Sequence, residues 1–418
     1  MPMFFASRRR AAIAFILVTA ALDIVAMGII IPVLPPLIEQ FVGSNAQAGI
    51  INGVFVALWA LMQFVASPIL GTLSDQVGRR PVILVSAAGL AADYVLMALA
   101  PNLWWLAVGR IVAGITSSSF TTAFAYMADI TAPEQRARAY GLIGAAFSAG
   151  FVAGPVLGGF LGEISPRAPF WVAGALSGVA FLYGLFVLPE SLAPENRMAF
   201  SWARANPLGS LRLLRSHPEL SGLALVNFLL YFAHHVFSAV FVLYAGYRYG
   251  WGAWEVGVLL ALVGVLDMIV QGLLVGPAVK RYGDRAVMVF GLFGGAVGIA
   301  CMGLAPTGLL FTLAMLPNAL WGLAMPTLQS LMTQRVSESE QGELQGANMS
   351  VASIAGVISP LFFGAVYAGT AGPAAWVAFS GMALLLAALV LLAAALIGWR
   401  VARDAQRAAA LAQERTSV

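Results

Sequence analysis

The sequence predicts an all-α membrane protein in which twelve transmembrane helices form two pseudo-symmetric six-helix halves. Charged residues make up 10% of the 418 positions and apolar residues 61%, whereas about a quarter of the residues of a soluble domain are charged. Long apolar stretches recur from end to end, and none shows the alternation over about ten residues that marks a membrane β-barrel. Because only a helix satisfies its own backbone within lipid, each stretch is predicted to be helical.

Each apolar stretch is close to the ~20 residues that a helix needs to cross a bilayer. Arg8 to Arg10, ahead of the first stretch, resemble the start of a signal peptide. The stretch is too long for one and lacks a small-residue cleavage site, so it is expected to be retained as the first span. The twelve predicted spans are residues 11–38, 48–73, 82–100, 103–127, 140–161, 170–188, 220–244, 256–279, 287–304, 309–332, 347–368 and 374–397.

The basic residues are distributed asymmetrically between the loops. With both termini placed in the cytoplasm, the outer loops contain only Arg167 and Arg248, and Arg110 is the one basic residue within a span. This fits the positive-inside rule for an even number of spans. The basic charge therefore indicates contact with anionic lipid, and nucleic acid is not expected as a partner. Cys301 stands alone, so no internal disulfide is expected. The inner segments hold Arg8, Arg9, Arg10, Arg79, Arg80, Arg136, Arg138, Arg197, Arg204, Arg212, Arg215, Lys280, Arg281, Arg285, Arg335, Arg400, Arg403, Arg407 and Arg415.

The longest polar segment lies between spans six and seven and separates the two halves. The sequence predicts a first bundle at residues 1–189, a cytoplasmic linker at 190–218, a second bundle at 219–400 and a cytoplasmic tail at 401–418. Within the linker, Trp202 and several leucines mix with Arg204, Arg212 and Arg215, which favours a short helix on the inner membrane surface. A flexible linker is the alternative.

A constant shift of 205 residues superposes landmarks of the two halves from span two through span eleven. Duplicated six-span halves are typical of carriers that rock about a central site near the membrane midplane. The superposed pairs are Gly71 and Gly276, Gly78 and Gly283, Arg80 and Arg285, Gly141 and Gly346, Pro155 and Pro360, and Gly159 and Gly364.

The turn after span two contains Gly71, Asp75, Gly78, Arg79 and Arg80. Its glycines permit tight helix ends, and Asp75 can pair with either arginine or with a neighbouring helix terminus. An ordinary polar turn is the alternative, although such turns seldom combine glycines and both charge signs at this spacing.

Spans four and five carry further charged and small residues. Span four contains Arg110 near its beginning and leads into Asp129, and Arg136 follows across the turn. Span five contains a string of small residues around Gly154 and Pro155. Small residues at four-residue spacing let helices pack closely, and a Gly-Pro pair softens the helix. This string therefore predicts a close helix contact more strongly than ligand binding.

Three acids lie within predicted spans: Asp23, Asp93 and Asp267. A rise of 1.5 Å per residue places each of them ~18–20 Å from the inner end of its span. A carboxylate at this depth costs at least ~2.5 kcal/mol, so it tends to face water and to be functional. It can hold a proton or a cationic substrate, but not both comfortably, and this competition is the basis of proton-coupled antiport. A structural acid is the alternative, and Arg110 either tunes an acid or pairs with polar groups.

Uncharged polar residues within spans are candidates for substrate binding, although they more often join helices. They are Asn52, Gln63, Asn227, Gln329 and Asn348. His234 lies beside Tyr231 in span seven and either relays protons or is a hydrogen-bonded core residue. No metal site is predicted from these residues. Most tryptophans lie near span ends as interfacial anchors, but Trp59 is a candidate for contact with a ligand.

The turn after span two resembles the signature loop of the major facilitator superfamily, in which this loop latches an inner gate. The Gly-Pro string of span five resembles the motif that marks antiporters of that superfamily. Further segments look like the tetracycline/proton antiporters over nearly the whole chain. These segments are residues 22–23, 32–35, 57–63, 78–82, 93–94, 162–166 and 344–346, with Gly28, Gly141, Gly154 and Pro155.

This resemblance implies roles for individual residues. It assigns substrate and proton handling to Asp23, Gln63, Asp93 and Arg110, and the inner-gate charges to Asp75, Arg80, Asp129 and Arg136. The second half departs from the pattern, because those antiporters place a histidine in span eight where this chain has Asp267. They also have an acid in span nine, where this chain reads Gly-Leu-Phe-Gly-Gly at residues 291–295. Either Asp267 carries the proton instead, or the pocket takes a different amphipathic compound.

The expected function is therefore proton-coupled efflux of a small amphipathic compound, cationic or metal-chelated, with tetracycline as one candidate. Alternating access, a bacterial-type cytoplasmic membrane, cytoplasmic termini and a functional monomer are expected with it. No cofactor is expected beyond the proton gradient, although the substrate could carry a chelated divalent metal. A nutrient importer on the same fold is one alternative, and a membrane receptor or multi-span enzyme is another. No catalytic residues are expected, because no nucleophile or metal cluster is found.

Overall fold

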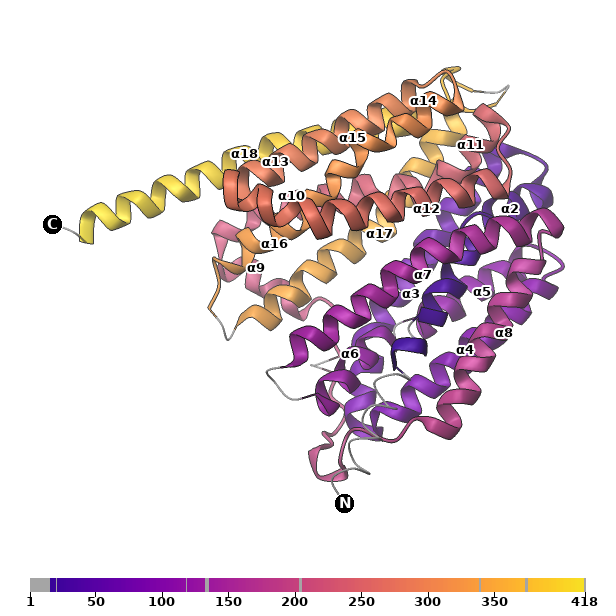
Figure 1. The fold of residues 1–418 in the computed structure, drawn as a ribbon, viewed down its shortest axis with the longest axis horizontal. Helices are drawn as coiled ribbons and strands as arrows, with labels where there is room; N and C mark the ends of the chain where they lie inside the picture. Colours follow the sequence, from indigo (N-terminus) through magenta and orange to yellow (C-terminus); the bar gives the residue numbers. More distant parts are fainter. Residues whose placement is uncertain are drawn as a thin grey trace. The chain divides into compact units, whose positions relative to one another are not determined.

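The computed structural model describes residues 16–416 except 20, 118, 132–134, 203–204, 338–339 and 373–374. Within this described part the regular elements are helices, and no strand occurs (Figure 1). Contacts group the chain into two compact units. The first unit comprises Met1–Ile51, Leu58–Pro207 and Gly250–Gly264, and the second comprises Asn52–Ala57, Leu208–Tyr249 and Val265–Val418.

The helices of the first unit follow the first six predicted spans. Polar side chains fix two of the helix starts, since Ser44 accepts from the amide of Gln47 and Asn102 from the amides of Trp104 and Trp105. Such caps satisfy amides that have no partner in the first helical turn. The elements are the span Ile16–Val42, which ends in α2 (Leu34–Val42), then α3 (Asn45–Val77), α4 (Arg79–Leu99), α5 (Leu103–Thr116), α6 (Ser119–Ile130), α7 (Arg136–Ile164) and α8 (Ala168–Val187).

The linker and the second half contain shorter and less regular elements. In the linker, the described residues form the short helix α9 (Arg212–Ser216), preceded by the 3₁₀ turns η2 (Pro194–Asn196) and η3 (Gly209–Leu211). The spans that follow are α10 (Pro218–Val236), the π-helix η4 (Phe237–Phe241), α11 (Val242–Tyr249), α12 (Ala253–Ile269), the π-helix η5 (Val270–Leu274), α13 (Val275–Leu304), α14 (Gly308–Leu313), α15 (Met315–Ala319), the 3₁₀ helix η6 (Leu320–Leu323), α16 (Ala324–Thr333), α17 (Gln341–Thr370) and α18 (Met382–Thr416).

The structure confirms the predicted fold class. Ten helices of the described part are long and apolar enough to cross a membrane, and Leu103–Thr116 is a shorter apolar helix. The run Ala253–Leu304 holds spans eight and nine, which separate at Gly283, where φ is 77°. With α5 and α6 together forming span four, the helices account for the twelve predicted spans. Arg8 to Arg10 and the start of span one lie outside the described residues.

One predicted span boundary is wrong. Span four corresponds to α5 and α6, which run from Leu103 to Thr116 and from Ser119 to Ile130. Span twelve begins at Met382 instead of residue 374. The amide of Trp376 donates to the carbonyl of Gly369 at 2.7 Å, which turns this segment back onto the end of α17.

The 205-residue repeat is visible in the backbone. Gly78 and Gly283 both have positive φ, 110° and 77°, and each marks the bend at the inner end of its half. Arg80 then donates to the carbonyl of Leu185 on α8 at 2.8 Å, and its counterpart Arg285 donates to that of Trp399 on α18 at 2.9 Å. In each half, this arginine joins the start of the third span to the end of the sixth.

Glycines permit a second pair of equivalent contacts. A Cβ on Gly53 would clash with the carbonyl of Pro360 in the second unit, and one on Gly257 would clash with that of Pro155 in the first unit. In the first unit, Gly154 of α7 also packs directly on Gly28 of the first span, so a Cβ there would lie 2.8 Å from the Gly28 Cα. The small residues of span five therefore serve the close helix packing that the sequence predicts.

Candidate functional site

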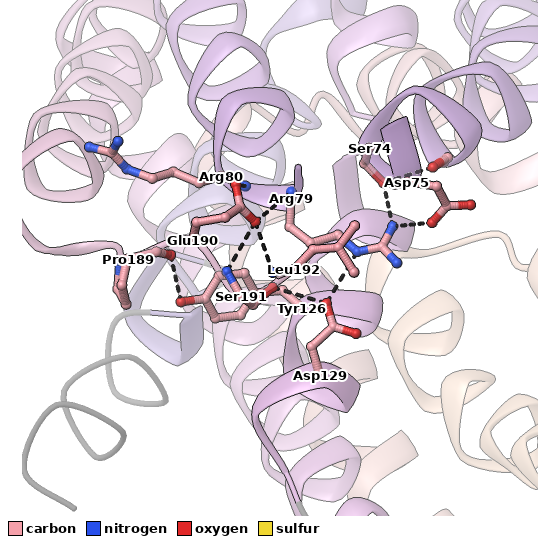
Figure 2. A network of polar contacts seen from close by, with 11 residues as sticks. Ser74, Asp75, Arg79, Arg80, Tyr126, Asp129, Pro189, Glu190, Ser191 and Leu192 are labelled. Carbon is pink, nitrogen blue, oxygen red and sulfur yellow. Dashed lines mark hydrogen bonds and ion pairs between the residues drawn. The ribbon is translucent and has the colours of Figure 1, made fainter. Parts of the chain in front are cut away.

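The inner end of the first unit carries a network of polar contacts that joins the ends of α3, α6 and α8 to the start of α4 (Figure 2). The chain turns from α3 into α4 at Gly78, whose φ of 110° is readily adopted only by glycine. The carboxylate of Glu190, which follows α8, accepts from the amides of Arg79 at 2.8 Å and Arg80 at 3.2 Å. A Cβ on Gly78 would clash with this carboxylate, so the turn and the cap both depend on the glycine.

Arg79 is the central side chain of this network. Its guanidinium lies 2.6 Å from a carboxylate oxygen of Asp75 and 3.3 Å from one of Asp129, and it donates to the hydroxyl of Ser74 at 2.6 Å (Figure 2). The hydroxyl of Ser191 donates to the same Asp129 oxygen at 3.0 Å. Three predicted gating residues, Asp75, Arg79 and Asp129, thus form one chain of ion pairs.

The structure places the other predicted gating residues at several different positions. Arg80 pairs with the α8 backbone, as described above, and Gly71 faces open space. Arg136 begins α7, but its side chain lies outside the described residues. Gly154 and Pro155 belong to the α7 packing interface.

Sequence reasoning missed Glu190. It also accepts from the amides of Ser191 and Leu192 at 3.0 and 3.1 Å, so one carboxylate fastens the beginning of the linker to the start of α4. The amide of Met198 in the linker donates to the carbonyl of Asp75 at 3.0 Å. The only signal in the sequence was an acid between Pro189 and Ser191, directly after a span.

Replacing Glu190 by alanine is expected to destabilise the protein by about 1 kcal/mol, because α4 loses its N-terminal cap. Thermal unfolding of the purified protein in detergent measures this. Glu195→Ala serves as the control, since Glu195 is an exposed linker acid. Equal melting temperatures for the two variants would contradict the capping role.

A second cluster lies within the spans of the first unit. Asp93 is 1% exposed, and neither of its carboxylate oxygens has a hydrogen-bond partner among the described residues. Arg110 interacts electrostatically with Asp93, and Tyr94 interacts with Asp23, Asp93 and Arg110. A terminal nitrogen of Arg110 lies 3.1 Å from the sulfur of Met97. The structure therefore places Asp23, Asp93 and Arg110 around Tyr94.

Close packing holds Asp93 in place. A Cβ on Gly109, the residue before Arg110, would lie 2.8 Å from an Asp93 carboxylate oxygen. One oxygen of Asp23 is likewise buried without a partner. A buried carboxyl without hydrogen bonds is costly unless a proton or another cation neutralises it. This cluster is thus suited to bind and release a proton.

Several of the polar candidates have partners on other helices. Asn52 is 2% exposed and donates to the carbonyls of Ser238 and Ala239 at 3.0 and 2.7 Å. Both carbonyls belong to the π-helix η4, so Asn52 satisfies backbone groups at a helix irregularity. Asn348 donates to the side chain of Gln329 at 3.1 Å, and Asn227 donates to the carbonyl of Asn348 at 3.4 Å. These contacts fit the role of joining helices.

The remaining candidates are divided between the two units. In the first unit, Gln63 is half-buried and has polar contacts of its own, and the carbonyl of Trp59 would meet a Cβ on Gly114 at 2.6 Å. In the second unit, the carbonyl of Tyr231 lies 2.7 Å from a ring nitrogen of His235, and His234 packs on aromatic rings. Asp267 also lies in the second unit.

Among the described residues, no group of three or more His, Cys, Asp or Glu side chains that could hold a metal ion occurs.

The fold, the charged inner network and the acids within the spans define a polytopic membrane carrier. Residues 16–360 and 223–418 match the profile of the Major Facilitator Superfamily, and the chain belongs to that superfamily. It is 41% identical to the tetracycline resistance protein, class C, of Escherichia coli over 360 residues, which cover 86% of this chain and 90% of that protein. It is 39% identical to the class G protein of Vibrio anguillarum, over 92% and 97% of the two chains.

Solved structures share the fold at low sequence identity. A bacterial homologue of the human lysosomal transporter Spinster, in an inward-facing and unoccupied conformation, matches with a TM-score of 0.78 at 16% identity, covering 95% of this chain and 97% of that one. The nucleoside transporter NupG matches with a TM-score of 0.76 at 13% identity, covering 93% and 98%.

Proposed function

We propose that this protein exports a small amphipathic drug-like compound, with tetracycline the first candidate, in exchange for protons. The observation that carries the proposal is the Asp23, Asp93 and Arg110 cluster, in which buried carboxylate oxygens have no hydrogen-bond partner. The names of the related tetracycline resistance proteins support the choice of drug. The small-residue string of α7, which resembles the antiporter motif, favours export over the import of a nutrient.

In the proposed mechanism, the cluster alternates between a proton and the substrate. Arg110 balances one of the two acids, so a second positive charge is needed to neutralise the other. A proton supplies it in one conformation, and a cationic substrate or its chelated metal supplies it in the other. The proton and the substrate compete for the same carboxylates, so they cross the membrane in opposite directions.

The inner network acts as the gate in this cycle. The Asp75, Arg79 and Asp129 ion pairs hold the inner ends of α3, α4 and α6 together within the first unit. Arg79 is only 11% exposed, so water weakens these pairs less than it would on an open surface. Alternating access then requires that this part of the first unit moves as one body.

The expected setting is a bacterial cytoplasmic membrane with both termini in the cytoplasm, where the proton gradient drives export by a functional monomer. We propose no cofactor, no catalytic chemistry and no nucleic-acid partner. A divalent metal is proposed only as part of a chelated substrate.

Expression in a host without its own efflux pumps tests the function. The wild-type protein is expected to raise the inhibitory concentration of tetracycline at least about tenfold, and dissipating the proton gradient is expected to restore drug accumulation. Arg79→Ala is expected to lower resistance by loss of the gate contacts, whereas Glu195→Ala retains it. Drug accumulation that is the same with and without the protein would contradict export.

A further inference from the structure

The last turns of α7 pack closely on the beginning of α12, at the end of α7 opposite to the inner network. The predicted topology makes this the outer end. A Cβ on Gly159 would lie 2.6 Å from the carbonyl oxygen of Ala253, and one on Gly162 would lie 2.8 Å from the Cβ of Ala253. Both partners belong to the first unit, which includes Gly250–Gly264. A helix of the first half thus contacts a helix of the second half directly, through small residues.

Glu163 lies in the last turn of α7 and adds a hydrogen bond to this contact. One of its carboxylate oxygens accepts from the amide of Trp254, in the first turn of α12, at 3.3 Å. The residue before α12 is Gly252, whose carbonyl accepts from the amide of Val256 at 3.3 Å. Glycine has no side chain to accept from the free amides of the first turn, and Glu163 takes that role from another helix. We call this hydrogen bond the outer cap.

Gly252 leaves room for the outer cap. A Cβ at this position would lie 2.8 Å from the same oxygen of Glu163 and 3.3 Å from a carboxylate oxygen of Glu255. Glu255 accepts from the amide of Gly252 at 2.8 Å, so two acids share the start of α12. A carboxylate is favourable at the beginning of a helix and unfavourable at its end. Glu163 ends its own helix, so α12 supplies the favourable interaction that α7 lacks.

Two other polar contacts at the outer end stay within the first half. Arg167 donates to the carbonyls of Ala98 and Ala100 at 2.9 and 2.8 Å. Asn45 donates to the carboxylate of Glu39 at 3.1 Å. These contacts remain intact when one half rocks against the other. The outer cap runs from the first half to the second, so it must break before the outer ends of α7 and α12 can separate.

We propose that Glu163 is a positioning residue that holds the outer side of the carrier closed, because its carboxylate caps α12 across the two halves. The cap is present while the outer side is closed and is lost when it opens. Glu163 acts on transport through α12, not through the cargo. This inference goes beyond the proposed function, since it concerns the alternation of the halves and holds for any cargo.

Distances between two spin labels at the outer end of the full-length protein test this. Pro101 and Pro306 are exposed, follow spans three and nine, and are equivalent under the 205-residue shift. Pro101→Cys and Pro306→Cys carry the labels, and Cys301→Ser removes the exposed native thiol. Glu163→Ala is expected to raise the ratio of molecules with distant outer ends to those with close outer ends about fivefold, the effect of losing a typical helix cap.

A second substitution on the other side of the cap separates this role from a general loss of stability. Gly252→Ala is expected to shift the ratio in the same direction, because its Cβ displaces the Glu163 carboxylate. Added to Glu163→Ala, it is expected to change the ratio by less than about twofold, since the displaced group is already absent. Glu39→Ala removes an acid whose hydrogen bond stays within the first half and serves as the matched control.

Distance distributions that are the same in wild type, Glu163→Ala and Gly252→Ala would overturn the proposal, and so would an equal shift in Glu39→Ala. If Glu163→Ala does not fold, as judged by thermal unfolding, Gly252→Ala decides in the same way. A shift in the distances, together with a wild-type protein that shows no proton-driven transport, would contradict the proposed function and leave the outer cap standing.

Discussion

Proteoliposomes with the Asp93→Asn variant are expected to lose proton-driven tetracycline uptake by roughly 100-fold, the lower range for removal of a positioned proton-transfer group. Asparagine has nearly the same shape as aspartic acid but cannot bind and release a proton. Because Asp93 is buried beside Arg110 without hydrogen bonds, the variant leaves the packing largely intact. Uptake under an imposed pH gradient is the measurement.

A second assay separates coupling from binding. Exchange of labelled for unlabelled drug across the membrane requires no net proton movement, so Asp93→Asn is expected to lose less of this exchange than of proton-driven uptake, although it also removes a carboxylate that binds the substrate. Glu343→Gln, which removes an exposed acid elsewhere, is expected to keep both activities. Proton-driven uptake by Asp93→Asn at the wild-type rate would show that Asp93 does not couple protons to transport.

The Gly154→Ala variant is expected to be less stable than wild type by about 2–3 kcal/mol, because the added methyl group overpacks a rigid contact. Its Cβ would lie 2.8 Å from the Cα of Gly28 and 2.9 Å from the carbonyl of Val25. Both neighbours are backbone atoms of the first span, so neither can move aside as a flexible side chain would. Thermal unfolding in detergent measures the loss of stability, and a drug-transport assay measures its effect on activity.

The same helix supplies a matched control. A Cβ on Gly144 of α7 would meet no atom within 4 Å. Gly144→Ala is therefore expected to be neutral or stabilising by up to about 1 kcal/mol, since alanine favours a helix more than glycine does. Similar losses of stability in Gly154→Ala and Gly144→Ala would mean that the close contact with the first span does not explain the glycine at position 154.

Much of the fold could be predicted because the membrane imposes simple requirements. Each span must be helical and long enough to cross the bilayer, so apolar length alone located nearly all of them. The repeat was predictable for a similar reason, since Gly78 and Gly283 occupy turns that other residues adopt with strain. The beginning of α18 was not predictable, because an apolar segment that folds back through Trp376 looks like part of a span.

The site was predicted less completely, because hydrogen-bond partners depend on tertiary contacts. The depth of Asp23 and Asp93 follows from residue counting, and the structure places them in one cluster with Arg110. Glu190 could not be recognised, since its role depends on α8 ending beside the start of α4. The sequence also gave no indication that Asn52 would face a π-helix.

The two halves use the repeated positions with different charges. Arg79 pairs with Asp129 at 3.3 Å, and the positions 205 residues later are Asp284 and Gln334, whose side chains are 3.2 Å apart. The contact is thus kept, but an ion pair in the first half becomes an amide-to-carboxylate hydrogen bond in the second. The stronger of these two contacts, the ion pair, lies in the half that contains Asp23, Asp93 and Arg110.

Proton release on drug binding tests most directly whether the Asp93 cluster exchanges protons for cargo. Preformed magnesium-tetracycline is added to purified protein in weakly buffered detergent solution, and a pH-sensitive dye records the protons released. Wild-type protein is expected to release protons as it binds the drug, and Asp93→Asn is expected to release fewer protons per drug molecule bound, at a drug concentration raised to offset its weaker binding. Drug binding by the wild type without proton release, or equal release by both proteins, would contradict proton-coupled exchange at this cluster.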